Sequence, residues 1–169
     1  KKKYPEYCIL KNYRNSLLQN KNTVEVTDFG AGSRIFKSNT RVINQIVKNA
    51  GISPKRAELL YRITEYFKPE TILEIGTSLG LATSALSLGN IKSKITTIEG
   101  CSNTLHVAQK QFEEFGFKNI TSINTEFSSY LKNYQLSIIN YQLIYFDGNH
   151  SKEATLNYFE LLLPTVTNE

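Results

Sequence analysis

From residue 71 onward the sequence alternates short apolar runs with segments of helical periodicity, and this alternation constrains the fold more than any other feature. Four apolar runs are predicted to be buried strands, at residues 71–76, 94–100, 119–124 and 141–148. A helical segment follows each of them, at residues 80–88, 103–115, 127–133 and 152–163. Unbroken apolar strands separated by helices predict an α/β protein with a doubly wound, mostly parallel sheet.

Residues 1–68 have a different character, because they are strongly basic and their predicted elements are mainly helices. They contain 14 Lys and Arg against 5 Asp and Glu, a net charge of +9, whereas residues 69–169 contain 6 against 10, a net charge of −4. Amphipathic helices are expected over 6–20 and 54–67; Ser53 suits the N-cap of the second and Pro54 its first turn. We therefore divide the chain into a basic helical N-terminal extension, 1–68, and an α/β core, 69–169.

Two glycine-containing stretches are candidates for a cofactor-binding turn. "TILEIGTSLG" (71–80) combines a buried strand, a turn and a helix start, and the next predicted strand ends in an acid, Glu99. A cofactor turn of an α/β fold needs these three features in this order. "TVEVTDFGAGSR" (23–34) is followed by a polar segment instead of a helix, so we interpret it as a polar loop, with the alternative of a flap that touches cofactor or substrate. The predicted site is therefore 74–80.

The residues around this turn indicate which cofactor it binds. The dinucleotide pattern G-x-G-x-x-G is absent, which argues against a nicotinamide cofactor. The carboxylate of Glu74 would repel a pyrophosphate but suits an ammonium or sulfonium group. Glu99 is placed to accept hydrogen bonds from both hydroxyls of a ribose. Together these features favour S-adenosylmethionine.

Three segments, in this order, resemble the motifs of class I S-adenosylmethionine-dependent methyltransferases, particularly the O-methyltransferase branch: "ILEIGTSLGLATSALS", "ITTIEG" and "LIYFDGNHSKEATLNYFELLLP". The resemblance covers about residues 58–164 and implies a Rossmann-like core. It also implies that the glycine turn surrounds the methionine part of the cofactor, that Glu99 holds the ribose and that Glu126 lies near the adenine. The expected cofactor-binding residues are Glu74, Gly76, Thr77, Ser78, Gly80, Glu99, Gly100, Glu126 and Asp147.

The fourth predicted strand ends in "YFDGNH", which places Asp147 and His150 across from the glycine turn, because the first and fourth strands of such a sheet are neighbours. Methyl transfer needs an acceptor that is aligned with the methyl group and freed of its proton. We therefore expect Asp147 and His150 to be the catalytic residues, the alternatives being roles in helix capping or substrate orientation. The resemblance implies a further role for Asp147, as a ligand of a divalent metal such as Mg²⁺.

The resemblance also implies that the N-terminal extension covers the substrate crevice. Its positive charge points to an anionic acceptor or partner, and its interleaved aromatic and basic residues are typical of an RNA-binding surface as well. The predicted function is methyl transfer to an oxygen of a small or medium acceptor. The alternatives are a methyltransferase that acts on RNA or another nucleic acid, and a non-catalytic module that binds S-adenosylmethionine.

Other features of the sequence concern the cellular location of the protein and the completeness of its core. No run approaches the roughly 20 apolar residues of a membrane span, and Cys8 and Cys101 form neither a metal-binding nor a disulfide pattern, so we expect a cytoplasmic protein without a membrane partner. The sequence ends just after a helix, where an α/β core would enter its next strand. We therefore expect a core that is incomplete at its C-terminus, with an exposed sheet edge that favours homo-oligomer formation.

Overall fold

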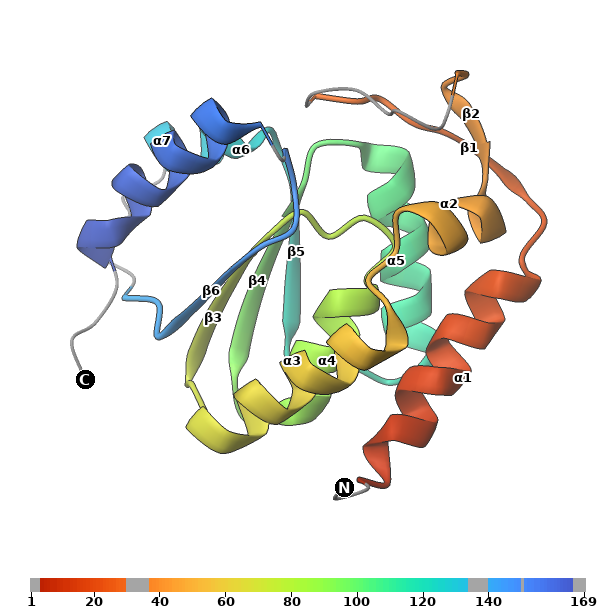
Figure 1. The fold of residues 1–169 in the computed structure, drawn as a ribbon, viewed down its shortest axis with the longest axis horizontal. Coiled ribbons are helices and arrows are strands. Elements are labelled where there is room, and N and C mark those ends of the chain that lie inside the picture. The colour runs from red at the N-terminus through yellow and green to blue at the C-terminus, as the bar shows by residue number, and fades with distance from the viewer. Residues whose placement is uncertain (1–3, 30–36, 134–139, 150, 166–169) are drawn as a thin grey trace.

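A computed structural model describes residues 4–29, 37–133, 140–149 and 151–165 of the chain (Figure 1). In these ranges no helix has both the length and the apolar character needed to cross a membrane. The elements follow one another as α1 (Glu6–Gln19), β1 (Thr23–Glu25), β2 (Thr40–Val42), α2 (Ile43–Asn49), α3 (Pro54–Phe67), β3 (Thr71–Ile75), α4 (Leu81–Gly89), β4 (Lys94–Glu99), α5 (Ser102–Glu114), β5 (Ile120–Asn124), α6 (Phe127–Asn133), β6 (Leu143–Phe146), α7 (Lys152–Leu162) and a short 3₁₀ helix (Leu163–Thr165).

The central sheet has the strand order β5-β4-β3-β6, and each neighbouring pair is parallel. This confirms the predicted α/β architecture, including the contact between the first and fourth predicted strands, β3 and β6. The register sets Glu74 of β3 between Thr97 of β4 and Tyr145 of β6. Because all four strands run in the same direction, the carboxyl ends of β3, β4 and β6 meet at one edge of the sheet.

Helices cover both faces of the sheet, as its unbroken apolar strands require. Ile72 and Ile95 pack in a cluster with side chains of α3 and α4. Leu73 and Ile75, whose side chains point the other way, pack in a second cluster with side chains of α6 and α7. In Figure 1, α6 and α7 lie on one side of the strands and α3 and α4 on the other, so the sheet is doubly wound as predicted.

The N-terminal extension packs onto the α/β core instead of standing apart from it. Tyr13 and Leu17 of α1 are fully buried, in a cluster that also contains Phe112 of α5. Helix α3 begins as expected, since the Ser53 hydroxyl accepts a hydrogen bond from the backbone N–H of Arg56 at 3.4 Å. The extension and the core therefore share buried apolar clusters.

Candidate active site

The turn between β3 and α4 depends on backbone conformations that favour glycine. Gly76 and Gly80 have φ values of +105° and +75°. A Cβ atom on Gly76 would lie 2.8 Å from the carbonyl carbon of Asp147, so the turn and the end of β6 touch through their backbones. A Cβ atom on Gly80 would lie 2.5 Å from the Tyr13 hydroxyl oxygen and would also strike the Phe112 ring. Neither position has room for a side chain.

Glu99 ends β4 and is held against this turn by backbone hydrogen bonds. The N–H of Ser78 donates to Oε2 at 2.8 Å, and the N–H of Cys101 donates to Oε1 at 2.9 Å. Burial raises the pKa of the Glu99 carboxyl, and these backbone donors oppose that shift. Since a carboxylate has about four lone-pair sites, these donors leave room for further hydrogen bonds. The geometry therefore fixes a carboxylate whose remaining acceptor sites suit a pair of neighbouring hydroxyls.

Glu74 lies deeper, fully buried in the centre of the sheet. Its Oε2 accepts hydrogen bonds from the hydroxyls of Thr83 at 2.5 Å and Thr97 at 2.6 Å. The Thr77 hydroxyl lies 2.6 Å from that of Thr97. When Glu74 is ionised, Thr97 gives it its one hydroxyl proton, so Thr77 then donates to Thr97. A chain of hydroxyls thus connects the glycine turn to the buried carboxyl.

The burial and the neighbours of Glu74 determine the charge state of its carboxyl. Burial is the main cause that raises its pKa to about 8; the two threonine hydrogen bonds oppose this shift, and the nearby carboxylates of Asp147 and Glu99 contribute to it. Its other oxygen, Oε1, is buried and has no hydrogen-bond partner in the described part of the chain. The carboxyl is therefore mostly protonated at neutral pH, and a cation placed beside it would favour its ionised form.

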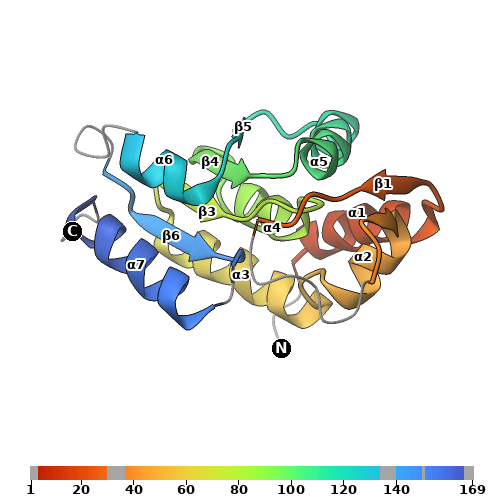
Figure 2. The same cartoon turned by 90° about the horizontal axis from the view of Figure 1, so that it is seen from above.

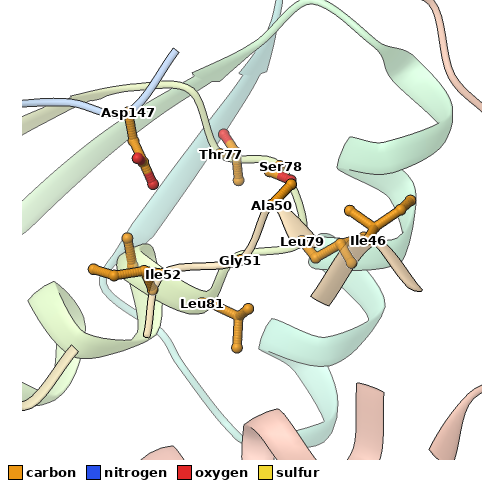
Figure 3. Close-up of a pocket in the computed structure, with 10 residues that line it drawn as sticks. Ile46, Ala50, Gly51, Ile52, Thr77, Ser78, Leu79, Leu81 and Asp147 are labelled. Carbon is orange, nitrogen blue, oxygen red and sulfur yellow. The ribbon is translucent and has the colours of Figure 1, made fainter. Parts of the chain in front are cut away.

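A pocket with about 260 Å³ of empty space, open solvent at its mouth included, lies between the glycine turn and the segment that joins α2 to α3 (Figure 3). One wall is the turn itself, and the Asp147 side chain extends into the same space from the end of β6. The opposite wall is largely apolar. Its lining residues are Ile46, Ala50, Gly51, Ile52, Thr77, Ser78, Leu79, Leu81, Ala82 and Asp147. The pocket therefore combines one carboxylate with an apolar wall from the N-terminal extension.

Most of the residues expected to form the site lie together at the carboxyl edge of the sheet. The glycine turn faces Glu99 on one side and Asp147 on the other. Glu126 follows β5 at the same edge, where its side chain is exposed, and the N–H of Thr125 beside it donates to the Glu99 carbonyl oxygen at 3.1 Å. His150 lies outside the described residues. The roles assigned to these residues remain predictions.

A divalent metal ion at Asp147 was the further role that the resemblance implied. Within ranges 4–29, 37–133, 140–149 and 151–165, no group of three or more His, Cys, Asp or Glu side chains is arranged to hold a metal ion. A divalent ion such as Mg²⁺ needs several oxygen ligands, and one carboxylate does not provide them. The described residues therefore do not by themselves fit a metal ion, and we derive no step through one.

Several contributors to the site were absent from the sequence prediction. Thr83 and Thr97 donate hydrogen bonds to the buried Glu74, and Ile52 lines the pocket. The signal for the threonines was present, because a hydroxyl in an otherwise apolar strand or helix often satisfies a buried polar group. Nothing local marks Ile52, whose position depends on how the N-terminal extension packs on the core.

The fold and the site together define a class of protein: an α/β domain with a glycine turn after its central strand and an acid at the end of the next strand. The family model described as a methyltransferase domain matches residues 73–169, which is more than half of the chain. The chain belongs to this family.

Solved structures with the same fold include proteins described as methyltransferases. The methyltransferase PaMTH1 of Podospora anserina, bound to SAH, has a TM-score of 0.62 and 22% identity over 69% of this chain and 50% of its own. The O-methyltransferase TomG of Streptomyces achromogenes, in complex with SAM, has a TM-score of 0.64 and 20% identity over 70% of this chain and 54% of its own. Cofactor-bound Rv0187 from MTB has a TM-score of 0.65 and 15% identity over 98% of this chain and 62% of its own.

At these identities the structural likeness concerns the fold. The chain spans about half the length of PaMTH1 and TomG, 50% and 54% respectively. No curated protein sequence matches it.

Proposed function

We propose that this chain is the cofactor-binding part of an S-adenosylmethionine-dependent methyltransferase that transfers the methyl group to an oxygen of a small or medium acceptor. Membership of the methyltransferase-domain family supports the reaction class. Structural neighbours solved with SAM or SAH support the cofactor, and those described as O-methyltransferases support oxygen as the acceptor atom.

The observation that carries the proposal is the way the Glu99 carboxylate is held. Backbone N–H groups of Ser78 and Cys101 each occupy one of its oxygens and so fix its orientation toward the glycine turn. In this orientation its free acceptor sites would take the two ribose hydroxyls of the cofactor. The methionine part would then lie along the turn, within range of the buried Glu74, whose ionised form a cationic ammonium or sulfonium favours.

The pocket beside the turn is the proposed place of methyl transfer. The acceptor oxygen would attack the methyl carbon as the bond from carbon to sulfur breaks, leaving S-adenosylhomocysteine, and the hydroxyl proton of the acceptor would pass to a base. Asp147 extends into the pocket and is the described residue best placed to receive that proton or to orient the hydroxyl. The apolar wall formed by residues 46–52 would contact the body of the acceptor and exclude water.

Calorimetric titration with S-adenosylhomocysteine tests the cofactor assignment. We expect the chain to bind this ligand and the Glu99→Ala variant to bind it about 100-fold more weakly or worse, because two hydrogen bonds to a charged group are lost. Glu113→Ala is the matched control, since Glu113 is an exposed glutamate near the other end of α5. If the chain does not bind the ligand, or if Glu99→Ala binds it as tightly as the unaltered chain, the proposal is wrong.

The acceptor is tested by transfer of a labelled methyl group from S-adenosylmethionine to panels of hydroxyl compounds, amines and RNA. The proposal expects label on oxygen of a small acceptor. Labelling of RNA, with a binding affinity that falls steeply as salt rises, would favour the nucleic-acid alternative instead. Binding of the cofactor without transfer to any acceptor, in the longest form of the protein that can be made, would favour a non-catalytic binding module.

A further inference from the structure

The end of β1 and the residues after it form hydrogen bonds with the start of α5, beside the candidate ribose carboxylate. The side-chain amide of Asn103 donates to the Glu25 carbonyl oxygen at 2.9 Å. The Thr27 N–H lies 3.3 Å from the Cys101 sulfur, which in turn lies 3.6 Å from the Glu25 carbonyl oxygen. In Figure 1 this part of the chain runs above the loop that joins β4 to α5, and Figure 2 shows it from above, over the edge where the strands end.

Phe29 lies at the end of this hydrogen-bonded segment, residues 25–29, and its ring packs against Gly100. A Cβ atom built on Gly100 would lie 2.6 Å from Cδ2 and 3.1 Å from Cε2 of Phe29. The ring therefore fills the space that a side chain at position 100 would occupy. Phe29 as a whole residue nevertheless remains 51% exposed.

The neighbouring residue confirms that the segment lies beside Glu99. Asp28 is close enough for its charge to raise the pKa of the Glu99 carboxyl. The Asp28 carboxylate is itself paired with the guanidinium of Arg41 of β2, at 3.6 Å. The positions of Asp28 and Phe29 thus follow from contacts with two separate parts of the fold, the β1–β2 hairpin and the loop after β4.

A nucleoside bound through its ribose at Glu99 needs an apolar surface for its base. Residue 100, which directly follows the ribose carboxylate, is a glycine and offers none. The aromatic ring of Phe29 lies against Gly100 and belongs to a residue that is half exposed, so it offers such a surface. Bases stack readily on aromatic side chains, and such stacking contributes between about 5-fold and 150-fold in affinity for each base.

We propose that Phe29 is a cofactor-binding residue whose ring forms the surface on which the adenine of the S-adenosyl cofactor stacks, in place of a side chain at position 100. This inference rests on the proposed function. It assigns a role to the described part of the stretch "TVEVTDFGAGSR", for which the sequence predicts a polar loop or, alternatively, a flap that touches cofactor or substrate. The segment after β1 then completes the adenosine end of the site from outside the α/β core.

Titration of a Phe29→Ala variant with two ligands tests the contact. We expect this variant to bind S-adenosylhomocysteine about 10-fold more weakly, and to bind adenosine more weakly by the same factor, because both ligands carry the adenine. Phe67→Ala is the control, since Phe67 is 72% exposed at the far end of α3 and should leave both affinities unchanged. Unchanged binding by Phe29→Ala overturns the proposal. Tighter binding also overturns it, because the ring would then occupy the place of the adenine.

A second variant reports stacking directly. The chain contains no tryptophan, so Phe29→Trp introduces a single indole fluorophore. Stacking of adenine on the indole should quench its fluorescence as S-adenosylhomocysteine is added, whereas the signal of Phe67→Trp should not change. Binding detected by calorimetry without any change in the Phe29→Trp fluorescence overturns the proposal.

The outcomes separate this inference from the proposed function. If the unaltered chain fails to bind S-adenosylhomocysteine, both the proposed function and the role of Phe29 are wrong. If it binds and Glu99→Ala weakens the binding, but the Phe29 variants behave as the Phe67 controls do, only the assignment of Phe29 is wrong.

Discussion

Replacing Glu74 by glutamine should change how the stability of the protein depends on pH. Glu74 is fully buried, and burial raises its pKa from an ordinary value of 4.5 to about 8. Glutamine keeps an oxygen that can accept the hydrogen bonds of Thr83 and Thr97, but it cannot ionise. The substitution therefore removes the titration of this group while retaining most of its contacts.

The sign and size of the effect follow from the two pKa values. Since the folded protein holds the proton more tightly than the unfolded chain does, the contribution of Glu74 to stability is complete below about pH 4.5 and is lost as the pH rises to about 8. A shift of one pKa unit corresponds to 1.36 kcal/mol, so the unaltered protein should lose about 3 to 4 kcal/mol between about pH 5 and pH 8 through this group alone. The Glu74→Gln variant should not show this loss.

The assay is urea unfolding of both proteins, without cofactor, at several values between about pH 5 and pH 8. The difference in unfolding free energy between Glu74→Gln and the unaltered chain should shift steadily in favour of the variant as the pH rises. Groups that titrate alike in both proteins cancel in this difference. Parallel pH profiles would refute the reasoning, because they would mean that the buried carboxyl keeps the same charge state in the folded and unfolded chains across this range.

Two further predictions concern the contacts of the glycine turn. Gly76→Ala should lower the unfolding free energy by about 3 kcal/mol or more, because its Cβ would strike the backbone at Asp147. Gly116→Ala is the control: it also has a positive φ but lies in open space, so it should cost only about 1 kcal/mol of backbone strain. Equal losses of unfolding free energy for the two variants in urea would contradict the clash. Tyr13→Phe should cost about 1 to 2 kcal/mol by removing the buried 2.9 Å hydrogen bond to the Leu79 carbonyl oxygen, while Tyr66→Phe, at a residue 78% exposed, should be neutral. Thermal melts of both variants test this, and a neutral Tyr13→Phe would show that the bond does not stabilise the turn.

The parts of the site that the sequence predicted are those whose chemistry is local in the chain. The strand at 71–75, the glycine turn and the start of α4 follow one another directly, and each has its own pattern of apolar residues, positive-φ glycines and helical periodicity. Glu99 was predicted for the same reason, since it ends the next apolar run. The adjacency of β3 and β6 needed one general rule about doubly wound sheets, and the register confirms it.

Other parts depend on contacts between distant residues, which no local pattern encodes. Thr97 reaches Glu74 because β3 and β4 pair in one particular register, and Thr83 reaches it from the following helix. Ile52 lines the pocket because of how the segment between α2 and α3 lies against the turn. The pKa of Glu74 likewise follows from burial by all of these elements together, whereas its sequence context suggested only a carboxylate that would attract a cation.

By itself, the sequence determined the class of fold, the glycine turn after the first strand of the core and the acid at the end of the following strand, because hydrophobic periodicity and glycine conformation act over a few residues. The tertiary structure decided what covers that turn. It brought Phe29 over Gly100 and the segment after α2 against the glycine turn. These contacts join parts of the chain that are far apart in sequence, and only the packing of the N-terminal extension on the α/β core brings them together.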